Sequence, residues 1–241
     1  MTADRWTQAV RQQVALGRLL PLGGPRDGAW IAEGAAAAVL GRAARDGLPQ
    51  VRLGALRIAL ADPEETQEPV VPGPPGALPP GALRVTADFV ATAAEPLPAL
   101  ASRLRLTLAT AATERLGLAV TEVDLRVTDL LEPEGGATTA VRAPQSTPAR
   151  EATDPDEARV AAAALAVAGV TGLTGSLGGL GRAVHLQERV AVAALPHRHV
   201  RVELATSADH RAVDVARRVR EAVRESLEDH PTVSVLITAV N

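Results

Sequence analysis

Two strand-like segments, each directly after a helix-like segment, constrain the fold of this chain most. They are AVTEVDLRVTDLL at 119–131 and TVSVLITAVN at 232–241, and they follow stretches with helical apolar spacing at 97–117 and 210–230. A strand after a long helix favours a right-handed crossover onto a parallel neighbour. The chain is therefore expected to contain two copies of one βαβ-based unit.

The segments before these two helices repeat as well. Each copy has an Ala-rich helix followed by two strands, at 30–47, 51–60 and 83–93 in the first copy and at 158–168, 183–192 and 199–207 in the second. The order α-β-β-α-β thus occurs twice in tandem. We predict an α+β fold of the two-layer α/β type, in which each copy forms a small mixed sheet with its helices on one face.

Proline and glycine mark the expected boundaries. Residues 132–156 have no periodic apolar pattern and are rich in Pro, Gly, Thr and acidic residues, which is typical of a flexible linker. They separate a first domain at 26–131 from a second at 157–241, and residues 1–25 form an N-terminal amphipathic segment. A Pro-rich insert at 62–81 in the first copy is expected to be an extended, solvated loop.

Composition excludes several kinds of site. The chain has no Lys and no Cys, so a Schiff-base lysine, a Walker lysine and a thiolate metal site are impossible. The net charge of −3 disfavours nucleic acid as a partner. No signal-peptide pattern opens the chain, and its longest apolar run, 160–170, is short for a membrane span. We therefore expect a cytoplasmic protein.

The glycine-rich segment GLTGSLGGLG at 172–181 has three interpretations. Gly-rich backbone can cradle a phosphate, but here a helix precedes it and a strand follows, which is the reverse of a phosphate loop. Gly175-Ser-Leu-Gly178 also spells the loop of a KH-type RNA-binding module, though it lacks flanking helices and basic residues. A flexible connector is the favoured interpretation.

Histidines are the remaining candidates for chemistry. His197 and His199 would share one face of a strand and could chelate a metal ion, but no third ligand is spaced to join them. We favour a solvated turn and strand edge here. No catalytic residue, cofactor or metal site is predicted, and an enzyme that uses the histidines is the least favoured function.

An interaction surface is the remaining type of site. Two arginines of the helix at 97–117 have few acidic neighbours, so that face suits an acidic partner, whereas the arginines of 210–230 alternate with acids as on a solvated helix face. The last strand is apolar on both faces, which predicts that the first domain or a second subunit covers it. The candidate residues are Arg103, Arg105, Arg217, Arg220, Arg224, Val235 and Ile237.

The pattern resembles the alkaline shock protein family, the bacterial envelope stress response proteins, in two tandem copies. The segments that carry the resemblance are WIAEGAAAAVLGRAA (30–44), LRVTADFVATA (83–93), GVTGLTG (169–175), ERVAV (188–192) and TVSVLITAV (232–240). The bias towards Ala, Arg and Gly suggests an actinobacterial source. The resemblance implies a non-enzymatic, membrane-proximal protein that forms oligomers with itself or a related member, or binds a small membrane anchor.

The sequence therefore leaves two alternative functions from different classes. The first is an interaction or scaffold protein of the cell-wall or alkaline stress response, which reaches the membrane only through a partner. The alternative is a KH-like RNA-binding module.

Overall fold

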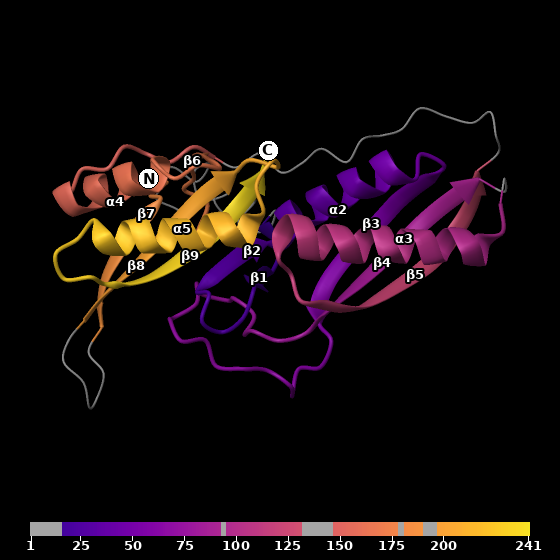
Figure 1. Cartoon of the computed structure of the whole chain (residues 1–241), viewed down its shortest axis with the longest axis horizontal. Helices are drawn as coiled ribbons and strands as arrows, with labels where there is room; N and C mark the ends of the chain where they lie inside the picture. The colour runs from indigo at the N-terminus through magenta and orange to yellow at the C-terminus, as the bar shows by residue number, and fades with distance from the viewer. Residues whose placement is uncertain (1–15, 93–94, 132–146, 178–180, 190–196) are drawn as a thin grey trace, which may run out of the picture.

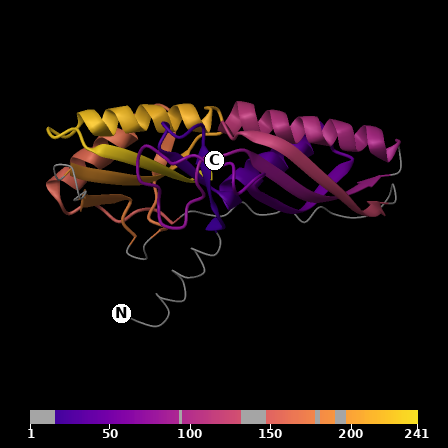
Figure 2. The ribbon, with the colours of Figure 1, turned by 90° about the horizontal axis from the view of Figure 1, so that it is seen from below.

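A computed structural model describes residues 16–92, 95–131, 147–177, 181–189 and 197–241. It shows two lobes side by side, each a sheet with its helices on one face (Figure 1). Seen after a quarter turn, helix α5 of one lobe and helix α3 of the other lie end to end over the two sheets (Figure 2).

The first lobe follows the predicted order. Its elements are α2 (Glu33–Gly47), β3 (Val51–Leu60), β4 (Leu83–Thr92), α3 (Leu97–Ala111), the π-helical turn η1 (Ala112–Leu116) and β5 (Val120–Leu131). Strand β4 is central, antiparallel to β3 and parallel to β5. Alternate residues of β4, from Leu83 to Ala91, are buried, so one face of this sheet carries the core and the other faces solvent.

The second lobe repeats that plan with one additional short strand. Its elements are α4 (Pro155–Leu165), β6 (Val170–Leu173), β7 (Val184–Arg189), β8 (His197–Thr206), α5 (Ala212–Glu225) and β9 (Thr232–Val240). Strand β8 is antiparallel to β7 and parallel to β9, as β4 is to β3 and β5. The predicted α+β fold with two α-β-β-α-β repeats is confirmed.

The N-terminal hairpin belongs to the second lobe's sheet. Strands β1 (Leu19–Leu22) and β2 (Ala29–Ala32) are antiparallel, and β2 runs parallel to β9 with Ala29 opposite Val235 and Ile31 opposite Ile237. The prediction of one helix over 30–47 was wrong for its first three residues, and Leu19 and Leu20, in the predicted N-terminal amphipathic segment, lie in a strand. The pairing partner lies some two hundred residues away, so local pattern does not reveal it.

Strand β9 is covered on both faces, as its apolar pattern predicts. Helices α5 and α2 both contact it. On the opposite face the hydroxyls of Thr238 and Thr174 lie 2.7 Å apart, and the Ser234 hydroxyl lies 3.0 Å from Nε2 of His199. The two repeats therefore form separate sheets, and the N-terminal hairpin is hydrogen-bonded to the sheet of the second repeat.

The Pro-rich insert is packed rather than solvated along its second half, which corrects the prediction. The N–H of Leu78 donates to the carbonyl of Leu19, and Nε1 of Trp30 donates to the carbonyl of Leu78 at 3.1 Å. Val71 is buried. A buried indole needs both apolar cover and an acceptor for its N–H, and the insert supplies both to Trp30.

Candidate interaction surface

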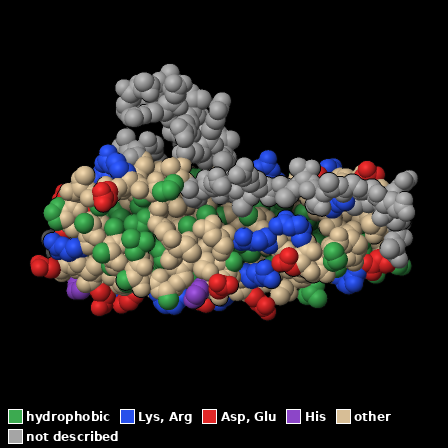
Figure 3. Space-filling view, turned by 90° about the horizontal axis from the view of Figure 1, so that it is seen from above, with side chains coloured by type: hydrophobic (Ala, Val, Ile, Leu, Met, Phe, Trp, Pro, Cys, Tyr) green, Lys and Arg blue, Asp and Glu red, His purple; other side chains and the backbone are tan. Residues whose placement is uncertain are grey.

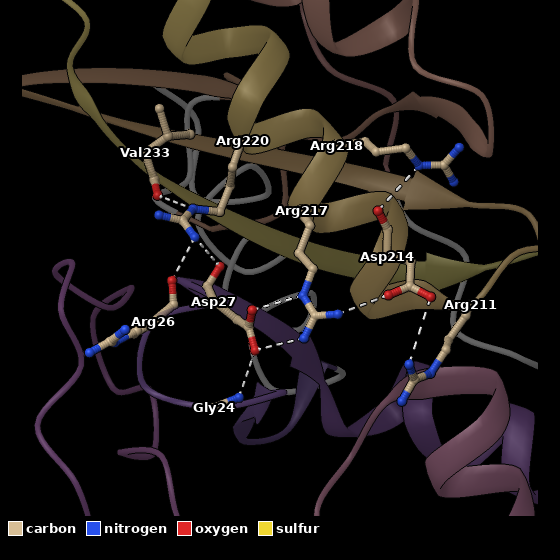
Figure 4. A network of polar contacts seen from close by, with 9 residues as sticks. All are labelled: Gly24, Arg26, Asp27, Arg211, Asp214, Arg217, Arg218, Arg220 and Val233. Atoms are coloured by element: carbon tan, nitrogen blue, oxygen red, sulfur yellow. Dashed lines mark hydrogen bonds and ion pairs between the residues drawn. The ribbon is translucent and has the colours of Figure 1, made fainter.

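Arg217 joins helix α5 to the β1–β2 turn (Figure 4). Its Nε and Nη2 donate to the two carboxylate oxygens of Asp27 at 2.8 and 3.1 Å, and its Nη1 donates to Asp214 at 3.0 Å. The same Asp27 accepts the N–H of Gly24. The hydrogen bonds from Arg217 hold the pKa of Asp27 below its usual range. This predicted surface residue is therefore bound within its own chain.

Arg220, three residues further along α5, is bound to three main-chain carbonyls. Its Nε donates to the carbonyl of Val233 at 2.9 Å, and its Nη1 donates to the carbonyls of Arg26 and Asp27 at 2.8 and 2.6 Å (Figure 4). Burial lowers the pKa of Arg220, because the charged form loses water there. The side chain of Arg220 thus satisfies main-chain carbonyls between β9 and the hairpin.

Further contacts at the same place join the two lobes. Arg211 donates to the carbonyl of Thr113 in η1, and Arg42 of α2 donates to the carbonyl of Val240 at 2.7 Å. Gly117, at φ +89°, lies so close to Val213 that a Cβ on Gly117 would overlap a Val213 methyl group. These three contacts join α5 and β9 of the second lobe to α2, η1 and Gly117 of the first.

Val235 and Ile237 are fully buried, so they present no surface to a partner. Each lies opposite a residue of β2 in the shared sheet. The apolar pattern predicts cover of these residues by the first domain, expected at 26–131, or by a second subunit, and strand β2, which lies within 26–131, provides cover along this edge. The prediction of an open interaction surface is therefore wrong for four of the candidate residues, which are bonded or buried within the chain: Arg217, Arg220, Val235 and Ile237.

The other predicted arginines remain exposed. Arg224 forms no hydrogen bond or ion pair through its side chain with a described residue, Arg103 pairs with Glu95, and Arg105 donates from Nε to the carbonyl of Val123 at 3.2 Å. Basic side chains gather on the first lobe in the space-filling view (Figure 3). Arg103 and Arg105 belong to α3, and Arg105 reaches a carbonyl of strand β5.

Strand β5 carries a surface that the sequence pattern did not reveal. Val127 is 39% exposed and Leu130 is 51% exposed, although both are large apolar residues. On the solvent face, Arg126 pairs with Asp88 and Arg84 pairs with Glu122. No described strand pairs with the outer edge of β5, whereas β2 occupies that edge of β9. One sequence signal could have identified this open edge. The closing strand at 119–131 alternates polar and apolar residues, whereas the closing strand at 232–240 is largely apolar on both faces.

The described part of the glycine-rich segment is fixed by a buried carboxylate. Oε2 of Glu203 accepts the N–H groups of Ser176 and Leu177 at 2.9 Å each, while Nε2 of His185 lies 3.2 Å from the other oxygen. Residues 174–177 are buried, so the flexible connector was wrong for them; residues 178–180, with Gly178, lie outside the described residues. Glu203 occupies amides that would otherwise suit an anion.

The two neighbouring histidines differ in environment. His197 is exposed, but His199 is buried between the hydroxyls of Thr232 and Ser234, at 2.9 and 3.0 Å from its ring nitrogens. The predicted solvated edge is therefore wrong for His199. Within the described ranges, no three His, Asp or Glu residues are grouped to hold a metal ion, and no helix is long and apolar enough to cross a membrane.

Comparison of the chain with models of known protein families gave no match, and comparison with curated proteins gave none either.

Proposed function

We propose that this chain is a non-enzymatic interaction protein of the envelope stress type, which binds another protein through the outer edge of strand β5. It acts in the cytoplasm by self-association or through a related or membrane-anchored partner, and it reaches the membrane only through such a partner. The resemblance in the two repeats suggested this class of function.

One observation carries the proposal. The two repeats place equivalent strands, β5 and β9, parallel to a central strand. β9 is completed by β2 along its outer edge, but no described strand completes β5. An unpaired edge presents a row of N–H and C=O groups that can accept a further strand, and main-chain pairing of this kind is a common mode of protein recognition.

Apolar exposure at the same strand supports this choice of surface. Val127 and Leu130 are partly exposed on β5. By contrast, every residue of β9 from Val233 to Val240 is buried beneath the rest of the chain. An added strand with a packed layer beside it would remove this apolar area from water, as the hairpin does in the second lobe.

Site-specific photo-cross-linking of the full chain tests the proposal. A photoreactive residue at Thr128, in the exposed part of β5, should give a covalent adduct with purified chain or with membranes of the producing organism. The same residue at Arg218, exposed on α5, is the matched control. Adducts at Thr128 should disappear when Val127→Pro removes an N–H from the edge, which an edge strand tolerates. Adducts that persist with Val127→Pro, or no adduct at Thr128, would refute the proposal.

A further inference from the structure

We infer that the strand which completes β5 is β5 of a second copy of this chain, paired antiparallel and centred on Leu125. The inference rests on the proposed function, because it names the partner for the same edge. It follows from which main-chain groups point outward and from the order of charges along the strand.

The outward main-chain groups of β5 are fixed by two observations. Arg105 donates to the carbonyl of Val123, so this carbonyl faces away from β4. The equivalent residue of the second repeat, Val235, donates its N–H outward to Gly28 beside β2. Every second residue of a strand points its N–H and C=O to the same side, so Leu125 and Val127 also face outward, up to the register shift that follows Val127.

In an antiparallel pair, a residue whose N–H and C=O point outward must lie opposite another such residue. This leaves few possible registers for pairing β5 with β5 of a second copy. Pairing centred on Leu125 places Val123 opposite Val127 and Arg126 opposite Asp124 of the second copy. Centring on Asp124 or Arg126 would put identical charges directly opposite each other. Centring on Val123 would put Glu122 opposite Asp124. Like charges directly opposite are destabilising and unlike charges stabilising, so the charges select the Leu125 register.

The two charged side chains have room for this second pairing. Arg126 is 75% exposed although it pairs with Asp88, and Asp124 is 65% exposed with Arg84 Nε at 3.6 Å. The twofold axis makes the Arg126–Asp124 contact twice. The same register brings Val127, which is 39% exposed, next to Val123 of the second copy. The two three-stranded sheets would then form one continuous sheet.

Charge reversal with light scattering on the full chain tests this register. The wild-type chain should be a dimer. Asp124→Arg and Arg126→Asp should each weaken it on the order of tenfold or more, because each creates two repulsive pairs. The double variant Asp124→Arg/Arg126→Asp should recover dimerisation, since the opposite charges face each other again. Far-ultraviolet circular dichroism confirms that each variant is folded.

Cysteine cross-linking provides a second readout that does not depend on affinity. The chain has no cysteine, so Asp124→Cys and Arg126→Cys introduce single thiols. Directly opposite, non-hydrogen-bonded residues have Cα atoms about 4.5 Å apart, within disulfide range. A mixture of the two variants should cross-link under mild oxidation, whereas each variant alone should not, because its own thiols lie a diagonal apart.

Three results would overturn the inference. The first is a wild-type chain that stays monomeric at about 100 μM, above typical transient affinities. The second is a double variant that does not recover dimerisation. The third is disulfide cross-linking within each single cysteine variant but not in their mixture. If Val127→Pro still abolishes adducts with another protein in these cases, the edge binds a different partner and the proposed function stands. If the dimer tests fail and Val127→Pro also leaves the adducts unchanged, both this inference and the proposed function are refuted.

Discussion

Arg217 on α5 and Asp27 in the β1–β2 turn form a two-pronged ion pair although 190 residues separate them in the sequence. Their contact holds the N-terminal hairpin against the last helix, so Arg217→Ala should destabilise the chain by roughly 1 kcal/mol, the upper range for partly exposed pairs. Arg218→Ala is the matched control, because among the described residues Arg218 bonds only to a carbonyl of its own helix. Equal urea midpoints for the two variants would contradict this role.

The same pair predicts a dependence of stability on acid pH. Arg217 lowers the pKa of Asp27, and Arg198 lowers the pKa of Asp229. Since both carboxyls bind fewer protons in the folded chain, the stability they contribute is present above the ordinary aspartate pKa of about 4 and is lost as pH falls through their lower folded values. Unfolding free energy should therefore fall below about pH 4. Asp27→Asn/Asp229→Asn should show a shallower fall, and a parallel fall would refute this origin.

Gly117 should tolerate no side chain. Its φ of +89° and its contact with Val213 both penalise a Cβ, so Gly117→Ala should cost roughly 2–4 kcal/mol from strain and overpacking. Gly76→Ala is a matched control, because Gly76 also has a positive φ but no atom lies within 4 Å of the place a Cβ would take. Thermal unfolding measures both. Val213→Ala should recover part of the Gly117→Ala loss, and no recovery would show that backbone strain alone acts.

Glu203 should fix the segment at 174–177. Glu203→Gln replaces one acceptor oxygen by an amide while keeping the shape, so the N–H groups of Ser176 and Leu177 lose a charged partner. A loss of about 1.5–3 kcal/mol is expected for hydrogen bonds to a buried charged group. Hydrogen exchange at these two amides should accelerate more than at the amides of β5. Unchanged exchange at both positions would show that the carboxylate does not hold the segment.

The repeat order could be predicted from sequence because its signals are local. The apolar spacing of α3 and α5 and the alternation of Glu122, Val123 and Asp124 in β5 each need only a short window. The hairpin could not be predicted in the same way. Trp30 continues an Ala-rich helical pattern, and only the distant strand β9 makes it a strand residue. Tertiary pairing overrides local preference at such a site.

The sequence predicted only part of the candidate surface, because burial by distant segments is again not visible in a local pattern. The exposure of Arg103 and Arg105 follows from their position on the outer side of an amphipathic helix. Arg217 and Arg220 have the same local pattern, yet the β1–β2 turn supplies acceptors for both. The apolar pattern of β9 correctly indicated burial, but pattern alone does not distinguish cover by the same chain from cover by another. The open counterpart was on β5, whose polar alternation resembles any half-solvated strand.

Arg105 should control access to the edge of β5. Its Nε donates to the outward carbonyl of Val123, which the partner strand would need as an acceptor. Natural edge strands often carry such charged side chains, which limit unwanted pairing. Arg105→Ala should therefore strengthen dimerisation several-fold, roughly the worth of one hydrogen bond. Arg103→Ala is the matched control, since Arg103 lies on the same helix but pairs with Glu95.

Sedimentation equilibrium on the full chain measures both arginine variants against the wild type. The expected order of dimer affinity is Arg105→Ala above wild type, with Arg103→Ala equal to wild type. The comparison is informative because both substitutions remove one positive charge from α3, so a general charge effect would move them together. Equal strengthening by both variants would assign the effect to net charge, and weakening by Arg105→Ala would show that this side chain contacts the partner instead of competing with it.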